Sequence, residues 1–233
     1  MTPICNLCGS TEWIDMNGRV GVRCRSCGSV ERTRAVKLVM DHLGIPKPGM
    51  RVLHLAPEKG LSTLFSAVCG DGYDPVDLDP RRYLHTRTRK FDIISDASTL
   101  PDNHYDIILH LHVLEHIPCN LAHAIYHLYR ALKPDGRHIF CIPLMSGHYD
   151  ECFAPLSNEM RTLRFGQFDH VRRFGVEDFD HHIGLLLNLD KDYSLYNTHS
   201  RDQLDACNIP VKERSGLNGS TIFVTSKTDY RLR

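Results

Sequence analysis

The chain has 233 residues, 42% of them hydrophobic, and its 28 Lys and Arg residues balance 28 Asp and Glu residues. This length suits one α/β domain with a small satellite, and zero net charge argues against a global field that recruits polyanions or anionic lipid. The start, MTPICNLC, has no basic region followed by an apolar one, and no later run approaches about 18 uncharged apolar residues. We therefore expect a cytoplasmic protein with no membrane partner.

Positive charge is nevertheless concentrated in two segments. One lies within residues 19–37, and the other, RRYLHTRTRK at residues 81–90, holds five cationic residues and no acid. Either segment can contact phosphate groups or form an ordinary solvated face. Nucleic acid therefore stays open as a partner, and the sequence does not indicate an oligomeric state.

Two Cys-x-x-Cys pairs stand near the start of the chain: Cys5 with Cys8, and Cys24 with Cys27. The fifteen residues between the pairs allow a short hairpin that brings four thiolates into a tetrahedron, which is the arrangement that zinc prefers. Iron in a rubredoxin-like site and a pair of disulfides are the alternatives. Four thiolates leave no open coordination position, so we expect a structural zinc knuckle and look for catalysis elsewhere.

Residues 29–43 have the apolar spacing of a helix, with Ser29 as the expected N-cap. A glycine and two prolines within residues 44–48 are expected to end it. We place a domain boundary here. Residues 1–45 form the knuckle with its helix, and residues 46–233 form the body of the protein.

In the body, strands and helices are expected to alternate. Apolar runs predict strands at 51–55, 76–78, 106–111 and 138–142, with helices near 61–68 and 121–132 and a turn at 134–136. This alternation predicts a parallel sheet covered on both faces, with ligands bound at the carboxyl ends of the strands.

The last third of the chain departs from the alternation. Residues 144–191 are rich in aromatic residues, His and Arg, and we expect an insertion that serves as a substrate lid. A helix at 201–207 is followed by two strand-like runs, 211–214 and 221–225, which predict a closing hairpin.

Five segments occur in an order that resembles the class I S-adenosylmethionine-dependent methyltransferases, over about residues 50–228. They are VLHLAPEKG, VDLDP, SDASTLPDNHYDIIL, HVLEHI and LYRALKPDGRHIFCIP. The four-cysteine knuckle together with LHLAPE and FGQFDHVRRFG also resembles a bacterial and phage subgroup, similar to methyltransferase type 11.

The resemblance implies an α/β fold with a Rossmann-like seven-stranded sheet, mostly parallel with a C-terminal antiparallel hairpin, behind a small N-terminal zinc ribbon. It also implies S-adenosylmethionine as a cofactor beside Zn²⁺. The residues it places at the cofactor are Leu55, Ala56, Pro57, Glu58, Gly60, Asp77, Leu78, Asp96, Ala97 and His110.

The first loop departs from the family pattern. His54 stands at the usual acidic position, Ala56 and Glu58 replace the first two glycines, and only Gly60 remains. Glu58 can supply the missing carboxylate from a different place, or it can narrow the pocket of a protein that has lost the cofactor. Asp77 ends the second strand, where a carboxylate can accept from both ribose hydroxyls, and Asp79 is the neighbouring alternative.

Methyl transfer from a sulfonium needs alignment of the acceptor, exclusion of water and removal of a proton from a hydroxyl or amine. The candidate bases are His110, His112, His116, Asp169 and His170, of which we assign His116, Asp169 and His170 as catalytic. A hydrogen-bonded structural role is the alternative for each histidine.

The spacing His112-x-x-Glu115-His116 resembles the E-x-x-E-H metal segment of small-RNA 2′-O-methyltransferases and some ubiquinone-pathway methyltransferases. It raises the hypothesis of a second, catalytic metal, with His148 as a further ligand. Many relatives that carry a similar segment need no metal.

The segment RTLRFGQFDHVRRFG at residues 161–175 is our choice for acceptor recognition, because its arginines suit carboxylate, phosphate or sugar contacts. An inert salt-bridged turn is the alternative. We expect a small polar acceptor of sugar or nucleotide type, or a modified nucleic acid. A different hypothesis is a catalytically silent, zinc-bearing nucleic-acid-binding module on the same scaffold.

Overall fold

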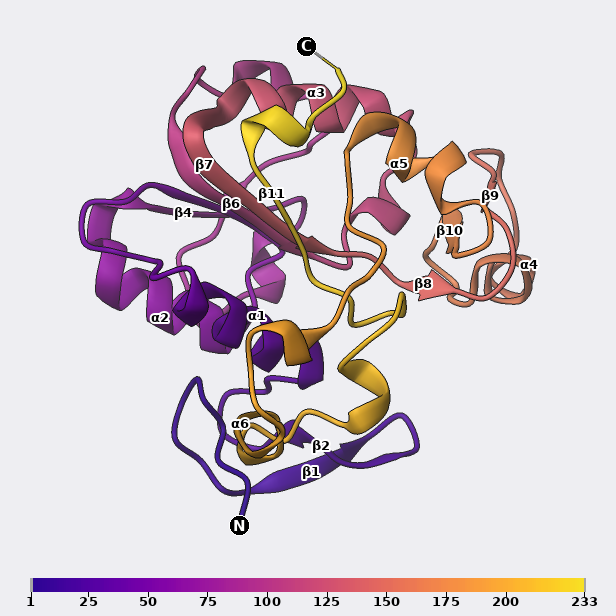
Figure 1. Ribbon diagram of the computed structural model, residues 1–233. Coiled ribbons are helices and arrows are strands. Elements are labelled where there is room, and N and C mark those ends of the chain that lie inside the picture. Colours follow the sequence, from indigo (N-terminus) through magenta and orange to yellow (C-terminus); the bar gives the residue numbers. More distant parts are fainter. Residues whose placement is uncertain (1, 233) are drawn as a thin grey trace.

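The computed structural model describes residues 2–232 and is built around a sheet of six strands in the order β11-β7-β6-β3-β4-β5 (Figure 1). All neighbours pair in parallel except β11, which is antiparallel to β7. The α/β class and the mostly parallel sheet are as predicted. The strands are β3 (Val52–Leu55), β4 (Tyr73–Asp77), β5 (Arg89–Lys90), β6 (Tyr105–Leu111), β7 (Leu132–Cys141) and β11 (Phe223–Thr225).

Helices cover both faces of this sheet. On one face, α1 (Glu31–His42) and α2 (Lys59–Cys69) pack against a buried layer that includes Ile107 and Leu109. On the other, α3 (Leu121–Ala131) and α5 (Ile183–Leu186) pack against a layer that includes Ile108. Alternate residues of β6 therefore face opposite layers, as expected for a strand buried on both sides.

The N-terminal residues form a hairpin of β1 (Trp13–Met16) and β2 (Arg19–Cys24), which lies beside α6 (Arg201–Ala206) at the lower end of Figure 1. Arg34 in α1 holds these parts together. Its buried guanidinium donates to the carbonyl oxygens of Val22 and Ser29 on the knuckle side and of Cys207 and Asn208 after α6. The knuckle is thus attached to the far end of the chain.

Residues 144–191 contain a second, three-stranded sheet in the order β8-β10-β9. Its strands are β8 (Leu144–Met145), β9 (Asp150–Glu151) and β10 (Arg172–Gly175), and α4 (Asn158–Phe165) lies between β9 and β10 in the chain. This small sheet stands apart from the main sheet, at the right of Figure 1.

Three expectations about individual elements are wrong. Ser29 does not cap α1, which begins at Glu31, because its hydroxyl lies 3.2 Å from the sulfur of Cys5 in the knuckle. No turn at 134–136 separates α3 from β7, since the chain passes directly from Ala131 into the strand at Leu132.

The closing hairpin is also missing among the described residues, which leaves six strands in the main sheet instead of seven. The run expected to form its first strand contains the 3₁₀ helix Val211–Glu213. Pro210 precedes it and has no N–H for a sheet, and the side chain of Val211 is exposed, so nothing favours an extended buried strand there.

No helix within residues 2–232 combines the length and the apolar character needed to cross a membrane.

Candidate active site

A cavity of about 1110 Å³ opens at the carboxyl ends of β3, β4 and β6. Its wall includes the loop after β3, the end of β4, residues 91–94, residues 111–118 and part of the segment before β10. This is the edge of the sheet where the strand alternation predicts a ligand site.

Five of the residues assigned to the cofactor line this cavity: Leu55, Ala56, Glu58, Asp77 and Leu78. Ala56 has a left-handed backbone with φ of 54°, a conformation that usually favours glycine, and its N–H donates to the carbonyl oxygen of Val76. The chain therefore keeps a sharp turn at the first glycine position although a methyl group stands there.

Glu58 places a carboxylate at the cavity because His54 holds it. The Nε2 atom of His54 lies 2.9 Å from Oε2 of Glu58, and its Nδ1 atom lies 3.0 Å from the hydroxyl of Tyr73. Tyr73 in turn donates to Ser62 of α2. His54 is completely buried, and its contact fixes the carboxylate of Glu58 at the cavity wall.

Asp77 is also held in place. One carboxylate oxygen accepts from the N–H of Asp79 at 2.8 Å, and the other accepts from the hydroxyl of Tyr83 at 2.9 Å. Burial and the neighbouring Asp77 charge raise the pKa of Tyr83, so this hydroxyl stays a donor. Asp79 instead pairs with Arg81 at the surface.

Pro57, Gly60, Asp96, Ala97 and His110 are not part of the cavity wall. A Cβ atom at Gly60 would lie 3.4 Å from Sγ of Cys27, so this glycine faces the knuckle. Asp96 accepts from the N–H of Asp92, and Ala97 is completely buried.

His110 lies inside the sheet. It is completely buried, and its Nε2 atom is 2.9 Å from Nε2 of His138. Burial lowers the pKa of His110 to about 3, so the ring is neutral. The structure gives it a packing role in place of the expected contact with the cofactor.

A cluster of imidazoles and carboxylates forms the wall after β6, where the cavity contacts Glu115, His116, Asp169 and His170. Glu115 is completely buried, and neither of its carboxylate oxygens has a hydrogen-bond partner. Burial raises the pKa of Glu115 to about 8. The Nδ1 atom of His116 lies 3.3 Å from the carbonyl oxygen of Asp169 and 3.5 Å from its carboxylate.

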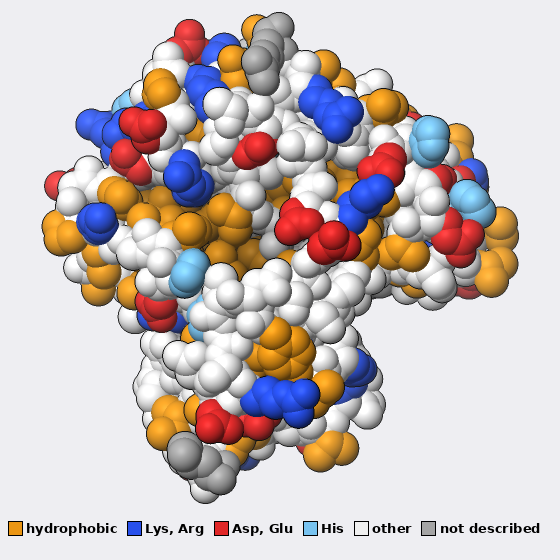
Figure 2. Space-filling view, in the orientation of Figure 1, with side chains coloured by type: hydrophobic (Ala, Val, Ile, Leu, Met, Phe, Trp, Pro, Cys, Tyr) orange, Lys and Arg blue, Asp and Glu red, His pale blue; other side chains and the backbone are white. Residues whose placement is uncertain are grey.

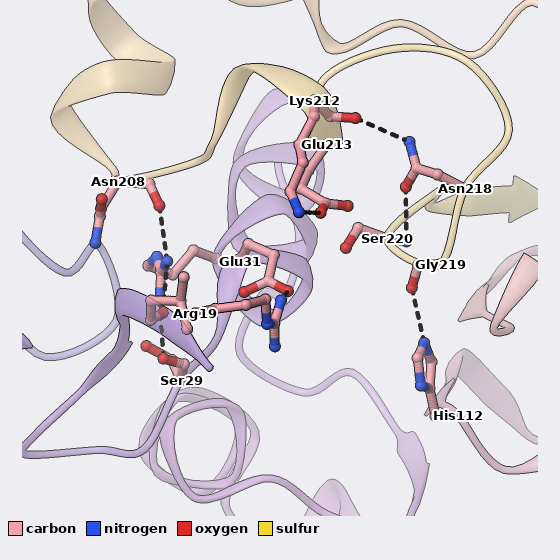
Figure 3. A network of polar contacts seen from close by, with 12 residues as sticks. Arg19, Ser29, Glu31, His112, Asn208, Lys212, Glu213, Asn218, Gly219 and Ser220 are labelled. Carbon is pink, nitrogen blue, oxygen red and sulfur yellow. Dashed lines mark hydrogen bonds and ion pairs between the residues drawn. The ribbon is translucent and has the colours of Figure 1, made fainter. Parts of the chain in front are cut away.

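His112 stands beside this cluster. Its backbone has φ of 56°, and its Nε2 atom donates to the carbonyl oxygen of Gly219 at 2.8 Å (Figure 3). The other ring nitrogen, Nδ1, lies 3.8 Å from Oε1 of Glu115. Burial lowers the pKa of His112 to about 3, which makes it a poor general base near neutral pH.

We expected the arginines of residues 161–175 to face the cavity, but they do not line it. Arg161 donates to the carbonyl oxygen of His170, Arg164 pairs with Asp150, and Arg173 donates to the carbonyl oxygen of His148. Arg172 is completely buried and donates to the carbonyl oxygens of Leu114 and Cys119. From this segment the cavity wall receives only Gln167, Asp169 and His170.

Sequence reasoning missed that the knuckle reaches the cavity. Met16, Asn17 and Arg19 at the hairpin tip line it, and Arg19 pairs with Glu31 of α1 (Figure 3). The Asn17-Gly18 pair was an available signal, because Asn-Gly typically forms the tight turn of a hairpin. The opposite wall comes from the C-terminal part of the chain, where Lys212, Glu213, Asn218, Gly219 and Ser220 line it.

The four knuckle cysteines are brought together as predicted. Their sulfur atoms all lie within 4.8 Å of one another, with 3.6 Å between Cys5 and Cys27 and 3.5 Å between Cys8 and Cys24. Tetrahedral zinc with bonds of about 2.3 Å separates its sulfurs by about 3.8 Å, so the donor set fits this ion. The separations are far beyond a disulfide bond.

The fold and the cavity define an α/β protein with an open cavity at the carboxyl ends of its parallel strands. A family model described as a methyltransferase domain matches residues 29–181, more than half of the chain. The chain therefore belongs to the methyltransferase domain family.

Solved structures give further likenesses. The chain is similar to a SAM-dependent methyltransferase from Archaeoglobus fulgidus, with 15% identity and a TM-score of 0.48 over 83% of this chain and 90% of that one. A methyltransferase from Mesorhizobium loti has 14% identity and a TM-score of 0.46, over 81% and 94%. Phosphoethanolamine N-methyltransferase 2 from Haemonchus contortus has 14% identity and a TM-score of 0.49, over 83% and 52%. No curated protein matches the chain.

Proposed function

We propose that this protein transfers the methyl group of S-adenosylmethionine to a hydroxyl or amine of a small polar acceptor of sugar or nucleotide type. The observation that carries the proposal is a single cavity whose two walls present different functional groups. Asp77 and Glu58 stand on the wall formed by β3 and β4, and the Glu115, His116 and Asp169 group stands on the wall after β6.

Asp77 is the proposed partner of the ribose hydroxyls, because its carboxylate is fixed at the end of β4 and lines the cavity. Glu58 is proposed to accept from the ammonium group of the cofactor's amino acid portion, with His54 fixing its position. Residues 91–94 are proposed to contact the adenine, since they line the cavity and the side chain of Asp96 does not.

His116, Asp169 and His170 are proposed to activate the acceptor. A bound sulfonium supplies an already activated methyl group, so the protein must align the acceptor and remove its proton. The side chains of His116 and Asp169 are 37% and 43% exposed, which leaves them reachable from the cavity, and the ring of His170 packs against that of His116. The knuckle hairpin and residues 212–220 limit the access of water.

A small acceptor fits these walls better than a long polymer. The cavity is bordered by the knuckle, the lid segment and the C-terminal turn. On the face shown in Figure 2, Lys and Arg are interspersed with Asp and Glu and form no continuous basic surface. A modified nucleic acid is the second acceptor class, because Arg19, Arg32 and Lys212 line the cavity.

We further propose that the knuckle, residues 1–45 with α1, binds a structural Zn²⁺ through Cys5, Cys8, Cys24 and Cys27. The support is the donor set and the spacing of the four sulfurs. The ion would fix the hairpin whose tip lines the cavity of the methyltransferase domain at residues 46–233.

Calorimetry with S-adenosylmethionine tests the cofactor assignment. We expect micromolar binding by the wild type and about 30-fold weaker binding by Asp77→Ala, because a charge-assisted hydrogen bond contributes about 2 kcal/mol. Asp79→Asn is the matched control and should bind as the wild type does. Absence of binding to the wild type would overturn the proposed function.

Transfer of tritiated methyl groups into a cell extract tests the acceptor class. We expect label in the small-molecule fraction, and we expect Asp169→Asn to lose at least about 90% of it while retaining cofactor affinity. Label confined to RNA or DNA would move the assignment to the second class. Unchanged transfer by Asp169→Asn would remove this residue from acceptor activation.

A further inference from the structure

The wall after β6 contains a second group of metal-binding side chains that is separate from the knuckle. Glu115, His116 and His170 each offer a ligand atom, and these atoms lie within 4.8 Å of one another. Glu115 follows β6 and His170 precedes β10, so only the folded chain brings them together.

Glu115 lacks the partners that a buried carboxylate requires. It is completely buried, and both of its oxygens are without a hydrogen bond. Its ion-pair partners among residues 2–232 are imidazoles, with Nδ1 of His112 at 3.8 Å and Nε2 of His116 at 4.0 Å. An ionised carboxylate without a hydrogen bond is costly in the interior, and the charges of Arg32 and Arg172 offset only part of that cost, so a bound metal ion would stabilise the ionised form.

The histidines around Glu115 are oriented as metal ligands commonly are. Nδ1 of His170 lies 3.2 Å from the carbonyl oxygen of Phe165, and Nδ1 of His116 lies 3.3 Å from the carbonyl oxygen of Asp169. A ring nitrogen that donates to an outer oxygen fixes the tautomer and leaves a lone pair on the opposite nitrogen. In His116 this opposite nitrogen, Nε2, faces Glu115.

We propose that Glu115, His116 and His170 bind a divalent transition-metal ion at the wall of the cavity. Two imidazoles with one carboxylate suit Mn²⁺, Fe²⁺ or Zn²⁺, whereas Mg²⁺ and Ca²⁺ prefer oxygen ligands alone. Three protein ligands leave open positions, and the cavity lies on that side.

The ion identifies an acceptor class, and this step rests on the proposed function. Open positions suit an acceptor with two neighbouring oxygens, such as the vicinal hydroxyls of a sugar. A hydroxyl held by such an ion would be more acidic. Asp169 would accept its proton as the new O–C bond forms and the C–S bond of the sulfonium breaks, which would release S-adenosylhomocysteine.

Equilibrium dialysis against Mn²⁺, after saturation of the knuckle with Zn²⁺, tests the site without any acceptor. We expect one Mn²⁺ per wild-type chain and at least about tenfold weaker binding by Glu115→Gln and His170→Ala. His148→Ala is the matched control, because this histidine pairs with Glu177 outside the cluster, and it should bind Mn²⁺ like the wild type. Circular dichroism checks that each variant is folded.

Absence of saturable Mn²⁺ binding by the wild type, or equal binding by the folded Glu115→Gln variant, would overturn this inference. Calorimetry on the same samples keeps the two proposals apart. Cofactor binding without Mn²⁺ binding rejects the metal site alone, and Mn²⁺ binding without cofactor binding rejects the methyl-transfer proposal alone.

Discussion

Histidines in this chain have different roles that depend on their burial. His110 and His138 lie side by side in β6 and β7, completely buried, with 2.9 Å between their Nε2 atoms. The hydroxyl of Tyr230 lies 2.7 Å from Nδ1 of His138. Burial lowers the pKa of both rings, so they are uncharged links in the core, whereas His116 is partly exposed at the cavity.

These buried rings predict an acid-sensitive core. Because the folded-state pKa lies below the usual value near 6.5, the unfolded chain binds more protons as the pH falls, and stability is lost below about pH 6.5. Each ring should reduce the free energy of unfolding by up to about 1.4 kcal/mol per pH unit. Urea unfolding between about pH 7.5 and 5 measures this slope.

The variant His138→Gln should have a slope lower by about 1.4 kcal/mol per pH unit, since one titrating ring is removed. His148→Ala, at an exposed histidine, serves as the control and should keep the wild-type slope. An identical pH dependence in His138→Gln would contradict the assignment of this ring to the acid response.

At the scale of elements, the expected lid, residues 144–191, is an ordered segment that is fixed to the edge of the cavity by hydrogen bonds. Arg164 joins α4 to β9 through Asp150, and Arg172 joins β10 to the segment after β6. The guanidinium groups that suggested acceptor recognition instead hold the lid in place. Asp169 and His170 keep their position at the cavity because of these contacts.

Gly175 tests the packing of the lid. A Cβ atom at this position would lie 2.2 Å from the carbonyl oxygen of Gly147, and backbone cannot move aside as a side chain can. We expect Gly175→Ala to reduce the free energy of unfolding by about 2–3 kcal/mol, measured by urea unfolding. Gly219→Ala is the matched control, because its Cβ would be 3.9 Å from the nearest atom. Equal stability of both variants would show that the lid is packed loosely.

At the scale of the molecule, the knuckle, the start of α2 and the C-terminal part are one connected structure. Gly60 of α2 packs against Leu7 and Cys27, and Lys59 donates to the carbonyl oxygen of Ser26. Arg34 ties the knuckle to residues 207–208. We therefore expect a change in the four-cysteine group to alter the start of α2.

Removal of the proposed zinc should weaken both stability and cofactor binding. Loss of about 3 kcal/mol would lower the melting temperature by roughly 6–12 °C, measured by scanning calorimetry before and after chelation. Cofactor affinity should fall because the hairpin tip lines the cavity. Cys27→Ala should reproduce both effects, and Cys152→Ser, outside the knuckle, should produce neither. A chelated protein with unchanged melting and affinity would exclude a structural ion.

Local patterns in the sequence were sufficient for the α/β class, most strand and helix positions and the clustering of the four cysteines. Residues 106–111 predict a buried strand because a short apolar run is formed by residues that are neighbours in the sequence, so no distant contact is needed to recognise it. The same reasoning failed at Ser29, where a contact with the distant Cys5 decided the local structure, and at residues 211–214, where a 3₁₀ helix follows Pro210.

Only the tertiary structure decided what surrounds the cavity. It brought His170 to Glu115, placed the Asn17 hairpin tip and the loop after β3 at one cavity, and used the arginines of residues 161–173 for internal hydrogen bonds. These contacts join residues that are far apart in the chain. Neither their spacing in the sequence nor their residue types tell how close such residues lie in space. Composition and periodicity determined which elements form, and packing determined which side chains meet.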